Sequence, residues 1–188
     1  HILQKVDQNN LKNIVQTISI PRHGWYNYES LLVVGKFIEE RLREYGYTVD
    51  LDEFSYHRKE YKNIIATLNG IGSNKEWLLI GAHYDSAMGS PGADDNASGV
   101  AVMLEIARIL KDNPIVDKIK FVAFTLEEPQ IFGLKFIIGS SHFVKKMKKL
   151  GYRYKAMILE SVGYFSEKKG SQNVPAFIKG PDVGNFLG

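Results

Sequence analysis

Metal-binding residue types occur in four short groups of this 188-residue chain, and three of the groups directly follow predicted strands. The strand-end groups are His83-Tyr84-Asp85, Glu127-Glu128 and Glu160. The fourth is an acidic turn, residues 92–99, with the sequence Gly-Ala-Asp-Asp-Asn-Ala-Ser-Gly. Ligands of open α/β sheets bind beyond the carboxyl ends of the strands, so we expect these side chains to converge on one rim. Carboxylates gathered in this way need a cation or shifted pKa values.

The residue types narrow the choice of metal. A combination of His, Asp and Glu suits zinc, although cobalt or manganese also fits. The chain has no cysteine, so thiolate metal sites and disulfides are both excluded. Each group alone has an ordinary structural explanation, such as a solvated turn or a helix cap. Their ordered occurrence at successive strand ends favours a metal site.

Hydrophobic periodicity predicts the elements that must position these groups. Apolar residues at helical spacing indicate helices over residues 11–18, 31–45, 97–111 and 140–150. Strand-like runs cover residues 48–56, 62–68, 77–82, 119–126 and 154–159. Gly46 is expected to end the second helix, and Asn96 is a plausible N-cap of the third. Strands alternating with helices predict an α/β fold, a three-layer α/β/α sandwich with a mostly parallel central sheet.

Composition excludes several classes of protein. Hydrophobic residues make up 44% and charged residues 24% of the chain, which is ordinary for one globular domain with a real core. The formal charge of +3 is small, and the lysines within residues 145–149 fall at helical spacing. They predict a solvated helix face, so no nucleic-acid partner is expected. No apolar run approaches the length of a membrane span.

Taken together, the motifs resemble metallopeptidase family 28. The matching segments are Gly81-Ala-His-Tyr-Asp-Ser86, residues 92–99 and Leu126-Glu-Glu128, within a resemblance that extends over about residues 28–164. The family includes bacterial leucyl aminopeptidases, aminopeptidase Y and glutamate carboxypeptidase. The resemblance implies a zinc exopeptidase fold of the phosphorylase/hydrolase-like type, with residues 1–188 forming a single catalytic domain.

Roles for individual residues follow from the resemblance alone. It implies two zinc ions, with His83 and Glu160 on one, Glu128 on the other, and Asp95 bridging both. Asp85 would hold the His83 ring through its second nitrogen, and Glu127 would be the general base. A cis peptide bond is expected between Asp95 and Asn96, and Asp94 is expected to be a structural turn residue.

Three features depart from the family pattern. Glu160 stands where many members have Asp, which still allows ligation. Residues 129–138 form a longer loop than usual, and we expect it to wall the substrate pocket; an unchanged substrate preference in Phe132→Ala would argue that it merely packs. The last ligand of the family is a downstream His, for which this chain offers only poor candidates: His1, His23, His57 and His142.

The third departure predicts that the C-terminal part of the domain is missing from this sequence. Residues 1–188 alone should then bind the second metal weakly and hydrolyse peptides poorly, and two tightly held zinc ions per chain would contradict this. Uncovered sheet or core surface should favour self-association. The resemblance favours a secreted or periplasmic protein, although no signal peptide is recognisable, and the compartment stays open.

The favoured function is a zinc aminopeptidase acting on peptide substrates. A carboxypeptidase needs a basic clamp for the terminal carboxylate, which the sequence does not identify. Two rivals share the fold: a single-zinc glutaminyl cyclase, and a non-catalytic binding domain such as the transferrin receptor ectodomain. The intact acidic turn with Glu127 and Glu128 fits the cyclase less well, and the retained set of metal-type residues argues against the binding domain.

Overall fold

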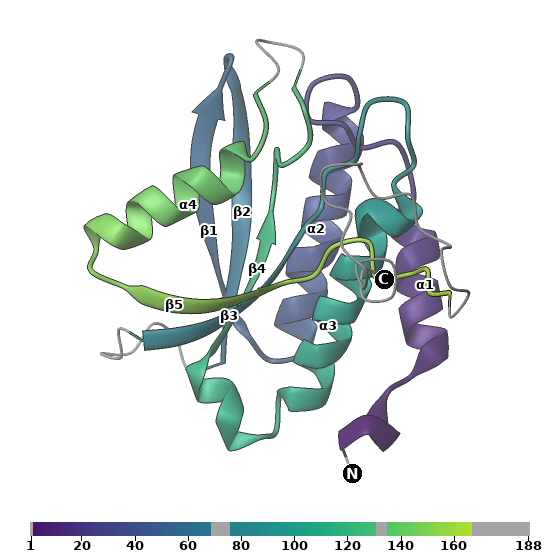
Figure 1. Cartoon of the computed structure of the whole chain (residues 1–188), viewed down its shortest axis with the longest axis vertical. Coiled ribbons are helices and arrows are strands. Elements are labelled where there is room, and N and C mark those ends of the chain that lie inside the picture. The colour runs from purple at the N-terminus through teal and green to yellow at the C-terminus, as the bar shows by residue number, and fades with distance from the viewer. Residues whose placement is uncertain (1, 69–75, 131–134, 167–188) are drawn as a thin grey trace, which may run out of the picture.

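A central five-stranded sheet organises the computed structural model, which describes residues 2–68, 76–130 and 135–166. The strand order is β1-β2-β4-β3-β5 (Figure 1). The strands are β1 (Thr48–Tyr56), β2 (Lys59–Thr67), β3 (Glu76–His83), β4 (Ile119–Phe124) and β5 (Arg153–Ile158). Phe132 lies outside the described residues.

Four of the five strands run in the same direction. β3 pairs in parallel with β4 on one side and with β5 on the other. β2 is antiparallel to β4, and β1 is antiparallel to β2, so β1 again points the same way as β3, β4 and β5. The carboxyl ends of β1, β3, β4 and β5 therefore lie at one rim of the sheet, as the sequence predicts for a mostly parallel sheet.

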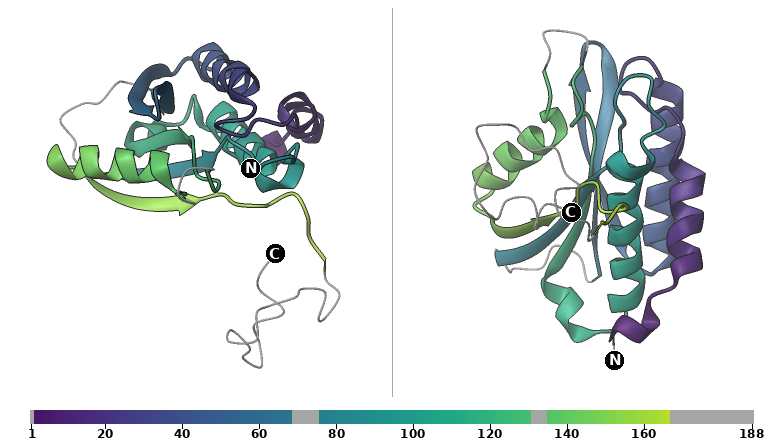
Figure 2. Two further views of the ribbon diagram at one scale, coloured as in Figure 1. Left: turned by 90° about the horizontal axis from the view of Figure 1, so that it is seen from above. Right: turned by 45° about the vertical axis from the view of Figure 1, so that its right-hand side comes forward.

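Helices cover both faces of the sheet. The helices α1 (Gln8–Ile18), α2 (Tyr28–Glu44) and α3 (Gly99–Leu110) lie on one face, and α4 (Ile138–Lys149) lies on the other (Figure 2). Short helices η1 (Ile2–Lys5), η2 (Ala93–Ser98) and η3 (Pro114–Lys118) complete the described elements. This arrangement is the expected three-layer sandwich.

The side chains on the two faces of the sheet pack into two separate hydrophobic cores. Ile64 and Ile80 belong to the larger core under α1, α2 and α3. Their neighbours Ile65 and Leu79 belong to the smaller core, in which Phe143 of α4 is also buried. Because successive side chains of a strand point to opposite faces, continuously apolar strands are what a sheet covered on both faces requires.

The elements lie within about three residues of their expected bounds. Gly46 adopts a φ of 93° just after α2, as expected of a residue that ends a helix. The α-helix after the acidic turn begins at Gly99 and is preceded by η2, and its N-cap is Ser98 and not the expected Asn96. The Asn96 side chain accepts a hydrogen bond from the Gly99 N–H at 3.1 Å. Among the described residues, no helix has the length and apolar character needed to cross a membrane.

Exposed apolar side chains gather on β5 and on the segment that follows it. Met157 and Ile158 are each about half exposed, and Val162, Tyr164 and Phe165 are exposed as well. The described residues therefore leave apolar surface at this end of the sheet open to solvent.

Candidate metal centre

His83, Asp95 and Glu160 bring three potential ligand atoms together at the rim of the sheet. His83 is the last residue of β3, Asp95 lies in η2, and Glu160 follows β5. The His83 Nε2 atom lies 3.0 Å from Asp95 Oδ1 and 3.2 Å from Glu160 Oε1. All three ligand atoms lie within 4.8 Å of one another. The convergence predicted from the strand ends is therefore present for these residues.

The spacing of these atoms fits a zinc ion. Zinc bonds of about 2.0–2.1 Å in a tetrahedral arrangement place neighbouring ligand atoms about 3.3 Å apart. The two distances from His83 Nε2 are only slightly shorter than this, so small adjustments would admit the ion. One imidazole nitrogen with two carboxylate oxygens is also a donor set that zinc prefers.

The charges around His83 favour a cation at this point. Burial works against the charged imidazole, but contacts with Asp85, Asp95 and Glu160 outweigh it and raise the pKa of His83 to about 12. The same contact with His83 lowers the pKa of Asp95. A divalent ion on Nε2 would supply the positive charge that a proton otherwise provides.

Asp85 connects the ring of His83 to the paired glutamates. Its carboxylate is fully buried, and Oδ1 lies 3.3 Å from the other ring nitrogen of His83, Nδ1. The same carboxylate accepts hydrogen bonds from the backbone N–H groups of Glu127, at 3.1 Å, and Glu128, at 3.0 Å. Asp85 thus lies beside the ring nitrogen that the resemblance assigns to it, and it also anchors the backbone of both glutamates, which the sequence does not reveal.

Glu128 lies in the segment that follows β4, at the same rim of the sheet as His83. Burial and the neighbouring Asp95 carboxylate raise its pKa to about 7. Such a shift is expected where two carboxylates approach each other without a cation between them. Glu128 stands outside the close cluster of His83, Asp95 and Glu160, and the charge of Asp95 acts on its carboxyl group.

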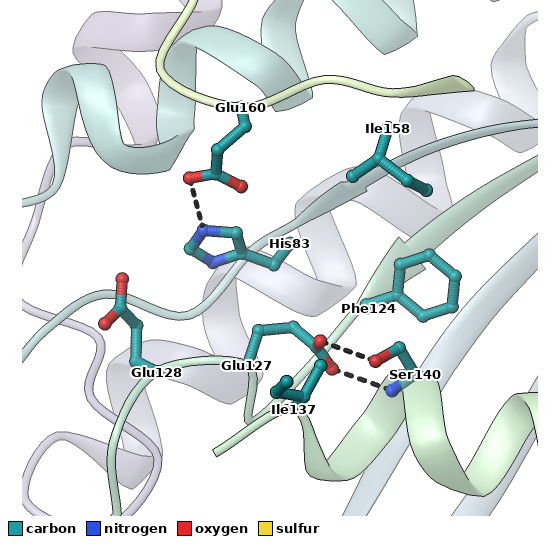
Figure 3. A pocket seen from close by; sticks show the side chains of 8 residues that line it. All are labelled: His83, Phe124, Glu127, Glu128, Ile137, Ser140, Ile158 and Glu160. Atoms are coloured by element: carbon teal, nitrogen blue, oxygen red, sulfur yellow. Dashed lines mark hydrogen bonds and ion pairs between the residues drawn. The ribbon is translucent and has the colours of Figure 1, made fainter. Parts of the chain in front are cut away.

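Glu127 is held by the first turn of α4. Its two carboxylate oxygens accept hydrogen bonds from the Ser140 N–H, at 2.7 Å, and from the Ser140 hydroxyl, at 2.6 Å. Figure 3 shows this carboxylate turned towards Ser140, while the His83 ring faces Glu160. Burial raises the pKa of Glu127 although both hydrogen bonds oppose the rise.

A pocket of about 410 Å³ joins these groups. It is lined by His83, Phe124, Glu127, Glu128, Ile137, Ser140, Ile158 and Glu160 (Figure 3). Ile137 belongs to the loop after the paired glutamates, so the part of this loop that the structure describes does wall the pocket, as expected.

The acidic turn is built to present Asp95. The peptide bond between Asp95 and Asn96 is cis, as the resemblance implies. The Asn96 side chain donates to the Leu159 carbonyl at 2.8 Å, which fixes the turn beside Glu160. Asp94 accepts a hydrogen bond from the Gly163 N–H at 2.7 Å, in agreement with its expected structural role.

Arg22 is a buried residue near the centre that sequence reasoning missed. Its guanidinium donates to the carbonyl oxygens of Ile18, at 2.9 Å, Tyr84, at 2.7 Å, and Gly92, at 2.9 Å. Burial lowers the pKa of Arg22 to about 10, although three carboxylates favour its charge: Asp85, Asp95 and Glu128. Its hydrogen bonds therefore connect the end of α1 to both ends of the segment between β3 and η2, residues 84–92. A single arginine in a loop carries no sequence pattern that would reveal such contacts.

The other described histidines lie away from the ligand cluster. The His23 ring bonds only to backbone groups: Nδ1 accepts from the Trp25 N–H at 3.1 Å, and Nε2 lies 3.2 Å from the Pro129 carbonyl. His57 lies in the turn after β1, and His142 of α4 lies 3.4 Å from Asp52. His1 lies outside the described residues. None of the three described histidines completes the metal centre.

Comparison with known proteins places the chain in a family. The model of peptidase family M28 matches residues 63–176. The Escherichia coli (strain K12) protein YfbL, described as uncharacterized, is 32% identical over 96% of this chain and 57% of its own length. Aminopeptidase YwaD of Bacillus subtilis (strain 168) is 50% identical over 38% of this chain and 14% of its own length.

A solved structure agrees with the fold. The glutaminyl cyclase of Porphyromonas gingivalis superposes with a TM-score of 0.71 at 25% identity, over 85% of this chain and 60% of that one. The chain thus spans less than two thirds of each of these proteins. The family match covers the acidic turn, the paired glutamates and Glu160. The chain therefore belongs to peptidase family M28.

Proposed function

We propose that this chain forms the catalytic part of a zinc-dependent aminopeptidase. The observation that carries the proposal is the cluster of His83, Asp95 and Glu160, with their ligand atoms within 4.8 Å. Glu127 and Glu128 line the same pocket. The similarity to aminopeptidase YwaD, which is 50% identical over 72 residues, supports the choice of activity.

The proposal includes two zinc ions. His83, Asp95 and Glu160 would hold one, and Asp95 and Glu128 would hold the other, with Asp95 shared. Zinc bound there would supply Lewis acidity towards the scissile carbonyl and lower the pKa of a water molecule towards roughly 7. The role of Asp85 is to keep the proton on Nδ1 of His83, which leaves Nε2 free to bind metal.

Glu127 would act as the general base. Its carboxylate takes a proton from the attacking water and returns it to the leaving amine of the substrate. A pKa raised by burial makes it a better base near neutral pH. Ser140 holds this carboxylate through two hydrogen bonds, so it positions the base.

The proposal is tested with amino-acid anilides and the complete protein. We expect hydrolysis of L-amino-acid anilides, its loss after treatment with a chelator, and its recovery when zinc is added back. The physical reason is that the proposed base and ligands cannot activate water without the ion. Hydrolysis that persists in a protein shown to be free of metal would refute the zinc mechanism.

Glutaminyl cyclisation is the second candidate, because a glutaminyl cyclase superposes on this chain with a TM-score of 0.71. The same protein sample is therefore given a peptide with an N-terminal glutamine. Cyclisation without anilide hydrolysis would favour the cyclase. A protein that has neither activity and binds no zinc would be a non-catalytic binding domain.

Removal of the Ser140 hydroxyl is expected to weaken catalysis without removing metal. In Ser140→Ala the Glu127 carboxylate loses one of its two hydrogen bonds and is held only by the backbone N–H. A hydrogen bond to a charged group contributes about 1.5–3 kcal/mol, so kcat should fall by about tenfold or more. Steady-state kinetics on an anilide measures the effect.

The conservative variant separates positioning from a general loss of structure. Ser140→Thr keeps the hydroxyl and should recover most of kcat, whereas KM and zinc content should stay near the wild-type values in both variants. A wild-type kcat in Ser140→Ala would show that the hydroxyl does not position Glu127.

A further inference from the structure

A second cavity, of about 580 Å³, lies at the same rim of the sheet as the metal centre. Its wall includes Tyr56, the last residue of β1. Since β1 runs in the same direction as β3 and β4, this carboxyl end faces the same rim as His83 and Phe124. Carboxyl ends of strands are where ligands of such sheets bind.

Ile137 lines both cavities. Its backbone N–H donates to the Glu127 carbonyl at 3.1 Å, and the next N–H, of Ile138, donates to the Leu126 carbonyl at 2.9 Å. The Gln130 N–H donates to the Lys135 carbonyl at 2.8 Å. The wall between the two cavities is therefore fixed to the same stretch of backbone that carries the proposed base.

The lining of the second cavity is apolar and basic. Phe54, Tyr56 and Phe136 supply aromatic surface, and Lys135 and Lys145 supply positive charge. None of its lining residues is Asp or Glu. Within the described parts of the chain, neither lysine forms an ion pair, so both charges are available to a ligand.

One carboxylate borders the cavity, because Glu60 accepts a hydrogen bond from the hydroxyl of Ser55, which lines it. His142, which stacks on Phe54 with ring centroids 4.7 Å apart, also lines the cavity. The acidic group closest to it is the fully buried Asp52, at 3.4 Å. The Asp52 carboxylate is already neutralised by Lys146 at 2.7 Å and accepts a hydrogen bond from Asn63 at 3.0 Å. Lys135 and Lys145 outnumber the bordering Glu60 carboxylate, so these three groups together carry a positive charge.

We propose that the second cavity binds the part of a peptide that follows the cleaved bond, and that it favours acidic residues there. This inference rests on the proposed aminopeptidase function. The leaving amine must lie near Glu127, which returns the proton to it. From that point the peptide has a path across Ile137 into the second cavity, where Lys135 and Lys145 meet its carboxylates.

The test compares substrates with and without a chain beyond the cleaved bond. Three peptide amides share the same first residue, followed by Glu-Glu, Gln-Gln or Lys-Lys, and an anilide of that residue has no peptide beyond the bond. We expect kcat/KM to be about fivefold higher for the Glu-Glu peptide than for the Gln-Gln peptide, and lowest for Lys-Lys. Added salt should reduce these differences because it screens exposed charges.

Charge variants assign the preference to the cavity. The double variant Lys135→Glu, Lys145→Glu should reverse the order of the three peptides, and the anilide should be hydrolysed at the wild-type rate. Lys149→Glu is the matched control, because Lys149 lies on the same helix, is exposed, and does not line the cavity. This control should keep the wild-type order.

Three outcomes would overturn the inference, and they separate failure of the subsite from failure of the proposed function. Equal rates for the three peptides, or a preference for acidic residues that survives in the double variant, would refute the subsite while anilide hydrolysis upholds the proposed function. A protein with metal bound that hydrolyses neither the anilide nor the peptides would refute the proposed function, and the subsite with it.

Discussion

Replacing Glu127 with glutamine is expected to lower kcat for an amino-acid anilide by about 10²–10⁴-fold, the usual contribution of a positioned general base. The amide is nearly the same size as the carboxylate and can still accept the hydrogen bond from the Ser140 N–H. It cannot take a proton from water. The loss should therefore appear in kcat, with KM changing little.

Zinc content distinguishes loss of the base from loss of the site. Glu127 is assigned no metal, so Glu127→Gln should retain the zinc of the wild-type protein, as measured by elemental analysis. Glu40→Gln serves as a control for removal of an exposed carboxylate, because Glu40 lies on α2 in an exposed ion pair with Lys36. Near-normal turnover in Glu127→Gln would remove Glu127 from the role of base.

Replacing His83 with alanine is expected to remove both zinc and activity. Among the described residues, His83 is the one imidazole in the ligand cluster, and without it Asp95 and Glu160 face each other with no neutral ligand between them. Lewis-acid stabilisation is worth several kcal/mol, so the loss of activity should reach about 10³-fold or more. Zinc bound per chain and the rate of anilide hydrolysis are measured together.

A histidine elsewhere on the surface provides the comparison. His57 is exposed in the turn after β1, where its φ is 46°, a conformation that asparagine tolerates. His57→Asn should keep wild-type zinc and activity. Full zinc content in His83→Ala would show that the ion binds elsewhere, and the assignment of the metal centre would then be wrong.

Asp85 and Arg22 are two buried charged residues that fix the backbone around the carboxylates at the rim of the sheet. Asp85 accepts two backbone N–H bonds while its carboxylate lies 3.3 Å from His83 Nδ1, so one buried charge contacts both the His83 ring and the paired glutamates. Arg22 brings a buried positive charge near Asp85, and its guanidinium donates to the carbonyl oxygens of Tyr84 and Gly92. Burying a charge costs less when its polar atoms are hydrogen-bonded, as those of Asp85 and Arg22 are.

The order of elements and the chemistry of the centre were determined by the sequence alone. Apolar runs ending in His83, Glu127 and Glu160 predict strand ends, because strand length and burial are local properties of the residue pattern. Residue type then restricts the metal, since imidazole and carboxylate ligands suit zinc and no cysteine is present. The motifs around Asp95 added the family resemblance and with it the cis peptide bond, which the structure contains.

Contacts between distant segments were decided only by the tertiary structure. The hydrogen bond from Ser140 to Glu127 joins residues 13 apart in the sequence, and the hydrogen bond from Arg22 to Gly92 joins residues 70 apart. Gly139 allows the first of these, because a Cβ atom there would come within 2.1 Å of the Thr125 carbonyl oxygen. The antiparallel direction of β2, and hence the place of the second cavity at the rim, likewise depends on strand pairing. Pairing and long-range hydrogen bonds depend on which surfaces meet when the chain packs, and no local pattern of residue types encodes that.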